Sequence, residues 1–239
     1  MSEKPISIGL RYGLTNLSEI DILNLTPPTG ANWQEVFNCV LIPEKVLELR
    51  ILDVGAGTSD AVSKLLELGA DAYALDPQYR NRAQLRSVLS RSIKKTFSEN
   101  RELLRLRKEA LSSFNQSIKG NPERYIEGFA TDIPFQDNYF DIVYSRVAIL
   151  SYLDVDTNLL NKAIDECLRV IKPGGSLRLF PFKGNNPANP KEIEIMRSIN
   201  NQRLLQRLRR IDIVDNVEIV SIPTSFDDGK TLVIQKTEK

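Results

Sequence analysis

The sequence predicts an α/β fold built on a doubly wound, mostly parallel sheet. The first reason is a short apolar run, 51–54, that leads into a glycine turn and then a helical pattern. The second is another apolar run, 71–75, that ends in an acid. The third is that strand and helix patterns go on alternating along the rest of the chain, as they do in α/β proteins.

The first strand is expected at 51–54 because its residues are continuously apolar up to Asp53, as in a buried parallel strand. Gly55 and Gly57 then allow a sharp turn and the close approach of a ligand, since they have no Cβ. Thr58, Ser59 or Asp60 can cap the helix that follows at 61–68. Gly69 comes directly after that helix and is expected to end it.

The second strand is expected at 71–76 and ends in Asp76, which lies 19 positions after Gly57. An acid at this distance can accept hydrogen bonds from both hydroxyls of a ribose. A dinucleotide-binding turn would have a third glycine at position 60, where this chain has Asp60. A carboxylate there would face a pyrophosphate, so the pattern favours a nucleoside cofactor without phosphate.

The remaining elements follow from periodicity and turn residues. A long segment between the second and third strands, 80–120, is expected to be an insert of two helices, at 85–97 and 103–118. Further helices are expected at 33–41, 157–171 and 192–210, and further strands at 125–131, 140–145, 176–181, 217–222 and 231–235. Lys172-Pro173-Gly174-Gly175 is expected to form a turn before the strand at 176–181.

Composition excludes several kinds of site. The 239 residues contain no histidine and two cysteines, Cys39 and Cys167, so neither a metal centre nor a Ser–His or Cys–His nucleophile is expected. The thiols are expected to be buried and reduced. Because the net charge is +1 and neither a signal peptide nor a membrane-spanning run is evident, we expect a cytoplasmic protein with no membrane partner.

The turn 53–57 together with Asp76 resembles motif I of the class I S-adenosylmethionine-dependent methyltransferases. Asp132-Ile133, Phe140-Asp141 and the run 169–175 resemble later signatures of the same family. The resemblance covers about residues 50–182 by motif. It implies a seven-stranded sheet with an antiparallel last strand, in a single domain over 1–239. Within it, 1–48 would be an N-terminal cap, 80–120 a lid, and 184–211 a loop and helix near the substrate.

The resemblance also implies S-adenosyl-L-methionine as the cofactor. Asp76 would bind the ribose, Asp132 would accept from the adenine amino group, and the backbone N–H of Ile133 would donate to the adenine ring. The full set of cofactor-binding residues implied is Asp53, Gly55, Ala56, Gly57, Asp76, Pro77, Asp132, Ile133 and Ser145.

In this family the residues after the fourth strand face the methyl group, so Ser145, Arg146 and Tyr152 are the catalytic candidates. Methyl transfer from a sulfonium is an in-line displacement that depends mainly on positioning, so the lack of histidine is compatible with it. Arg146 has two readings: it binds a carboxylate or phosphate of the substrate, or it forms a structural ion pair.

The resemblance implies methyl transfer to oxygen or nitrogen of a small molecule or short peptide, with an anionic acceptor among the candidates. Two alternatives stay open. Residues 80–110 contain ten Lys/Arg and three Asp/Glu, so the insert could dock RNA or a protein substrate. No aromatic residues interleave with the basic ones, which disfavours nucleic acid. The other alternative is an interaction module that binds the cofactor without turnover. The oligomeric state is left open.

Overall fold

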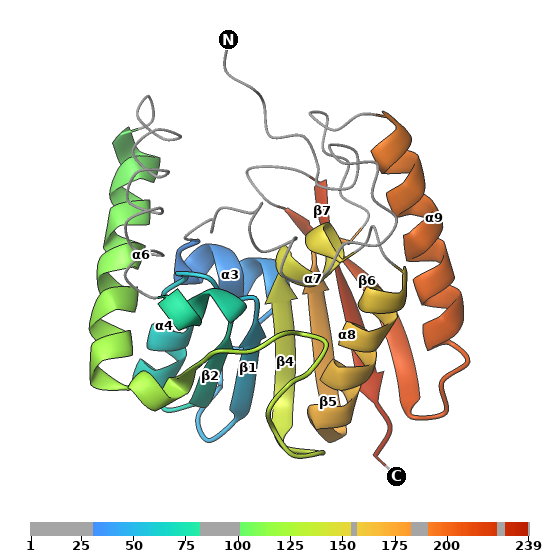
Figure 1. Ribbon diagram of the computed structural model, residues 1–239, viewed down its shortest axis with the longest axis horizontal. Helices are drawn as coiled ribbons and strands as arrows, with labels where there is room; N and C mark the ends of the chain where they lie inside the picture. Colours follow the sequence, from blue (N-terminus) through green and yellow to red (C-terminus); the bar gives the residue numbers. More distant parts are fainter. Residues whose placement is uncertain (1–30, 82–100, 154–156, 183–190, 224–227, 239) are drawn as a thin grey trace.

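The computed structural model describes residues 31–81, 101–153, 157–182, 191–223 and 228–238. Its centre is a seven-stranded sheet in the order β3-β2-β1-β4-β5-β7-β6 (Figure 1). The neighbours from β3 to β5 pair in parallel, whereas β7 is antiparallel to both β5 and β6. This arrangement confirms the predicted fold class. The strands are β1 (Arg50–Val54), β2 (Asp71–Leu75), β3 (Tyr125–Ile126), β4 (Phe140–Arg146), β5 (Ile171–Phe180), β6 (Val214–Pro223) and β7 (Asp228–Lys236).

Helices cover both faces of the sheet. On one face lie α3 (Trp33–Val40), α4 (Ala61–Glu67) and α6 (Arg101–Gly120), which share one buried cluster with β1, β2 and β4. On the other lie α7 (Ala148–Tyr152), α8 (Thr157–Val170) and α9 (Lys191–Leu208), whose apolar side chains share a second cluster with β4, β5 and β7. In Figure 1, α6 and α9 stand at opposite sides of the sheet, and the arrow of β4 points toward α7.

Strand β4 supplies both clusters because successive side chains of a strand point to opposite faces. Ile142 and Tyr144 belong to the cluster with α3 and α4, whereas Val143 belongs to the cluster with α8. The next residue on the α3 side is Arg146, at the carboxyl end of the strand. The alternation therefore directs a charged side chain toward α3 and α6.

The insert between β2 and β3 contains the expected second helix. Within α6, Ala110, Phe114 and Ile118 are buried at helical spacing, and Phe114 stacks on Tyr79 with ring centroids 6.2 Å apart. The expected first helix of the insert, at 85–97, lies outside the described residues, as does most of the expected N-terminal cap.

The expected third strand is wrong in length. Only Tyr125–Ile126 pairs with β2, and an isolated bridge between Phe129 and Asp132 follows. The backbone therefore turns back on itself instead of extending to Thr131. Asp132 lies beyond that turn and not at the end of a strand.

The expected turn at 172–175 is also wrong, because these residues lie inside β5. Phe140 pairs with Ile171 and Ile142 with Ser176, so four residues of β5 stand opposite Asp141 alone. Gly174 has φ 76°, and a Cβ on Gly175 would lie 2.7 Å from the carbonyl oxygen of Asp141. The two glycines thus form a bulge within a strand that is already paired.

In the described part of the chain, none of the helices combines the length and apolar character that a membrane span needs. The same residues contain no group of three or more potential metal-binding side chains. Cys39 and Cys167 are free thiols, both buried. The cytoplasmic location stays a prediction.

Candidate functional site

The turn after β1 lies at the carboxyl edge of the parallel strands, where ligands bind in sheets of this kind. Gly55 and Gly57 have φ angles of 75° and 56°, which residues other than glycine rarely adopt. The N–H groups of Gly55 and Ala56 donate to the carbonyl of Leu75 at 2.8 and 3.3 Å. The turn is therefore tied to the end of β2.

The start of α4 is capped by Ser59, whose Oγ accepts from the N–H of Ala61 at 3.1 Å. Asp60 occupies the N-cap position but makes no side-chain capping bond. Its carboxyl is buried, and burial raises the pKa of Asp60 to about 6. The two polar residues therefore differ: one caps the helix and the other is a buried acid beside the turn.

Gly55 also makes room for a helix. A Cβ at this position would lie 2.1 Å from the Cβ of Ala148, the first residue of α7. The absence of a side chain thus permits the close packing of α7 against the turn.

Asp76 directly follows β2, and its side chain connects the end of β2 to the turn that follows β1. Its Oδ2 accepts from the N–H of Gly57 at 2.8 Å, and its Oδ1 accepts from the N–H of Gln78 at 2.8 Å. The carboxyl is 7% exposed, and burial raises its pKa. Each oxygen keeps a lone pair after these bonds, so two further donors can be accepted. Pro77 begins the short 3₁₀ helix Pro77–Asn81 next to it.

Asp53, predicted to bind the cofactor, points into the face covered by α3. It is 3% exposed and accepts a hydrogen bond from the Tyr144 hydroxyl at 2.9 Å. Burial, and to a smaller extent the nearby carboxylate of Asp76, raise the pKa of Asp53 to about 7, although the Tyr144 bond acts to lower it. Asp53 therefore links β1 to β4 directly before the turn.

Ser145 is buried at the end of β4 and uses its hydroxyl inside the protein. Its Oγ donates to the carbonyl of Val54 at 2.8 Å and accepts from the N–H of Ile149 at 3.2 Å. It therefore ties β1 to β4 and α7. Because its hydrogen is already donated, the geometry argues against a catalytic role. Tyr152 ends α7, and its side chain lies outside the described residues.

Arg146 forms an ion pair. Its Nη2 donates to Oε1 of Glu35 on α3, and Oε2 of the same carboxylate lies 2.8 Å from Nη2 of Arg107 on α6. We call Glu35, Arg107 and Arg146 the charged triad. Sequence analysis missed Glu35 and Arg107. A signal existed for Arg107, which lies three residues before buried Ala110 and so shares the apolar face of α6.

Asp132 and Ile133, predicted to bind the adenine, lie at the surface turn after β3. Asp132 is exposed, and the N–H of Ile133 donates to Oε2 of Glu166 at 2.9 Å. Their role in adenine binding stays a prediction. Arg169 fixes this segment by donating to the carbonyl oxygens of Ile133 and Phe135, each at 2.8 Å. The residues that directly follow β3 are 127–130, so these are closer to the strand end than the predicted pair.

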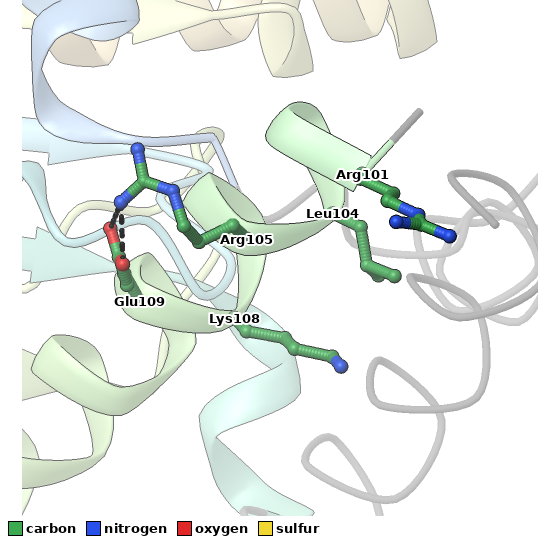
Figure 2. A pocket seen from close by; sticks show the side chains of 5 residues that line it. All are labelled: Arg101, Leu104, Arg105, Lys108 and Glu109. Atoms are coloured by element: carbon green, nitrogen blue, oxygen red, sulfur yellow. Dashed lines mark hydrogen bonds and ion pairs between the residues drawn. The ribbon is translucent and has the colours of Figure 1, made fainter. Parts of the chain in front are cut away.

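The outer surface of α6 carries much less free charge than the composition of the insert indicates. Arg105 pairs with Glu102 at 2.6 Å and Glu109 at 2.7 Å, and Arg107 points inward to Glu35. In Figure 2, Arg105 is turned to Glu109, whereas Arg101, Leu104 and Lys108 extend away from the helix. These five side chains line an open hollow of about 390 Å³. The described part of the insert therefore leaves a small basic area.

Comparisons with known proteins agree with the fold. The profile of the family described as "Methyltransferase domain" matches residues 103–179. The ubiquinone/menaquinone biosynthesis C-methyltransferase UbiE of Shewanella sediminis is 28% identical over 134 residues, which cover 56% of this chain and 43% of that protein. UbiE of Brucella canis is 26% identical and covers 68% and 51%. The chain thus spans about half the length of these relatives.

Among solved structures, a complex between the Haloferax volcanii Trm112 methyltransferase activator and a methyltransferase matches with a TM-score of 0.51. It is 15% identical and covers 87% of this chain and 90% of that chain. At this identity the match concerns the fold. The strand order and the profile match over residues 103–179 support the resemblance to the class I S-adenosylmethionine-dependent methyltransferase family.

The cofactor of this family is S-adenosylmethionine, and the residues at the turn fit it. Asp76 offers a buried carboxylate with spare lone pairs to the two hydroxyls of a ribose. The carboxylate makes no ion pair within the described residues. Hydrogen bonds from the ribose hydroxyls would therefore offset part of the desolvation cost of the Asp76 carboxylate.

Proposed function

We propose that the protein transfers the methyl group of S-adenosylmethionine to a small-molecule acceptor. The observation that carries the proposal is the geometry at the β1–α4 turn, where the Asp76 carboxylate holds the N–H of Gly57 at 2.8 Å and keeps acceptor capacity for a ribose. The sulfonium of the bound cofactor supplies an activated methyl group. The chain then has to bind the acceptor in line with that group and exclude water.

The charge distribution supports a small acceptor over RNA or a folded protein. An RNA-docking surface needs several free cations, because neutralising phosphates provides most of the binding energy. In the described part of the insert, Arg105 forms ion pairs with two glutamates, and Arg107 forms an ion pair with Glu35. Within 101–110, Arg101 and Lys108 are then the remaining described cations, and two cations make a weak electrostatic platform.

The acceptor atom is oxygen, nitrogen or carbon. The sequence motifs favoured oxygen or nitrogen, whereas the UbiE relatives carry the name of C-methyltransferases, which supports carbon. None of the three requires histidine when positioning dominates the chemistry.

The test is transfer of a labelled methyl group from S-adenosylmethionine to three separated pools: small-molecule extract, RNA and protein. The proposal expects label in the small-molecule pool, with loss of the signal in an Asp76→Ala variant. Label confined to RNA or protein would overturn it. Binding of the cofactor with no transfer to any pool would favour the non-catalytic interaction module.

A further inference from the structure

One side of the sheet, distant from the cofactor turn, is made by β6 and α9. Strand β6 is the last strand of the sheet, and among the described strands it pairs with β7 alone. Four strand steps separate β6 from β1, which is about 19 Å at the usual strand spacing. Figure 1 shows α9 at this side, opposite to α6. A partner bound here would leave the turn at Gly57 and Asp76 open.

The second half of α9 and the two residues after it are basic. Residues 199–210 contain four arginines and no acid. Arg207 forms an ion pair with Asp165 on α8. Arg203, Arg209 and Arg210 are exposed and form no ion pair within the described part of the chain. These three cations are therefore available to a partner.

Strand β6 and the turn before it carry the opposite charge. Asp212 lies in that turn, and Asp215 and Glu218 lie on the strand. All three acids are exposed, and none of them forms an ion pair with another described residue. Three available acids thus lie next to three available arginines.

Exposed isoleucines lie on the same two elements and on the turn that joins them. Ile199, Ile213 and Ile219 are 44%, 43% and 36% exposed. Among the described residues, the other large apolar side chains that are exposed are Leu47 and Leu68, before β1 and after α4. Apolar side chains rimmed by polar ones are typical of protein–protein contacts. We call the following residues the α9–β6 surface: Ile199, Arg203, Arg209, Arg210, Asp212, Ile213, Asp215, Glu218 and Ile219.

The mixed charge of the α9–β6 surface favours a protein partner over a polyanion. RNA and anionic membranes attract clusters of positive charge, and the three acids would oppose them. A second copy of the chain offers the same three acids and three arginines, so the surface is complementary to itself. A self-complementary contact closes into a dimer about a two-fold axis.

We propose that the α9–β6 surface binds a second copy of the chain, with the α9 arginines of each copy against the β6 acids of the other. Direct pairing of the two β6 strands is not the expected contact. The register of β6 shifts between Val214 and Asn216, and edge strands with bulges and charged side chains resist pairing with another edge. The contact is therefore made by side chains.

The two faces of β6 indicate the orientation of the axis. Val217 packs on the cluster under α8 and α9, so the next side chain, Glu218, points to the opposite face. A two-fold axis normal to the sheet would bring the two basic helices together on one face, where like charges repel. An axis in the plane of the sheet brings α9 of one copy to the Glu218 face of the other. We expect the second arrangement.

Charge reversal tests the dimer by sedimentation velocity on the full chain. One double variant, Arg209→Glu with Arg210→Glu, reverses the charge at the end of α9. The other, Asp215→Lys with Glu218→Lys, reverses the charge of β6. Each should weaken the dimer at least about tenfold, because like charges then face each other. An equimolar mixture of the two should restore the dimer, since each helix then meets a strand of opposite charge.

Arg101→Glu with Lys108→Glu is the matched control. It makes the same change in net charge as the α9 variant, but on exposed residues of α6 at the opposite side of the sheet. This variant should dimerise as the wild type does. Melting temperatures of all variants, measured in parallel, establish that each is folded. The measurement needs no cofactor, so its result is independent of the proposed methyl transfer.

Three outcomes would overturn the proposal. The first is a wild-type protein that is monomeric at about 100 µM, because a specific dimer has a lower dissociation constant. The second is a dimer that persists in both double variants or is not restored in their mixture, because the contact then lies elsewhere. The third is a monomer that binds RNA or phosphatidylserine vesicles through Arg209 and Arg210, which would assign these arginines to a polyanion.

Discussion

The two faces of the sheet bury different kinds of side chain. The face under α8 and α9 is dominated by aliphatic and aromatic groups from α8, β4, β5 and β7. The face under α3, α4 and α6 also buries Asp53, Tyr144 and Arg107. Because buried charges rarely increase stability over well-packed apolar groups, their presence on one face points to binding there. We therefore expect one face mainly to stabilise the protein and the other to support the proposed ligand site.

The largest expected effect is on the apolar face. Ile164 on α8 is fully buried, so Ile164→Ala removes packed groups and leaves a cavity. We expect the free energy of unfolding, measured with urea, to fall by about 2–5 kcal/mol. The dissociation constant for S-adenosylmethionine should stay within twofold of the wild-type value. A large loss of affinity would contradict the separate roles assigned to the two faces.

The second prediction concerns pH and the polar face. The pKa of Asp53 rises from its ordinary value of 3.8 to about 7 on burial. Between these values the folded protein holds the proton that the unfolded chain has released, so the free energy of unfolding falls as pH rises from 4 to 7. Three pKa units set an upper bound of about 4 kcal/mol.

Asp53→Asn removes this titration while keeping an acceptor for the Tyr144 hydroxyl. The variant should therefore gain stability relative to wild type as pH rises from 4 to 8, measured by thermal unfolding at each pH. Asp60 and Asp76 titrate in both proteins, so the difference between the two curves isolates Asp53. Parallel curves would contradict a buried, protonated Asp53.

The third prediction concerns the ribose contact. Asp76→Ala should weaken S-adenosylmethionine about 10- to 100-fold, because it removes hydrogen bonds to a charged acceptor. Asp76→Asn is the matched control, since its carbonyl can still accept from one of the two N–H groups that now bind the carboxylate. It should lose less affinity than the alanine variant. Unchanged affinity in Asp76→Ala would contradict the assignment of Asp76 as the residue that binds the ribose.

The smallest expected effect lies outside both faces. Arg105 is 54% exposed and pairs with Glu102 and Glu109 on the surface of α6. Exposed pairs within a helix contribute little, so Arg105→Ala should leave both the free energy of unfolding and cofactor affinity unchanged within error. A marked loss of methyl transfer to an RNA acceptor in this variant would revive the docking role of the insert.

Local patterns carried most of the fold prediction. The strand, glycine turn, helix and acid at 51–76 are encoded in neighbouring residues, so β1, α4 and β2 were found close to their observed bounds. The run 169–175 resembles a family signature, but the bulge that it forms in β5 depends on pairing with β4 and is not indicated by the neighbouring residues. The short β3 is a similar case, since only Tyr125 and Ile126 pair with β2 and this pairing is not encoded in neighbouring residues.

The site was predicted in part. The acid and glycines of the turn lie together at the strand ends, but sequence spacing did not reveal that Gly55 faces Ala148 or that Glu166 takes the N–H of Ile133. The charged triad could not be predicted as a unit, because Glu35 and Arg146 are 111 positions apart. Contacts of this kind arise only when the helices pack on the sheet.

The most direct test of the central claim is calorimetric titration of the protein with S-adenosylmethionine and, separately, with NAD. We expect micromolar binding of S-adenosylmethionine and no measurable binding of NAD, because Asp60 stands where a pyrophosphate-binding turn has glycine. Binding of NAD with no binding of S-adenosylmethionine would contradict the assignment of the turn at Gly55 and Gly57.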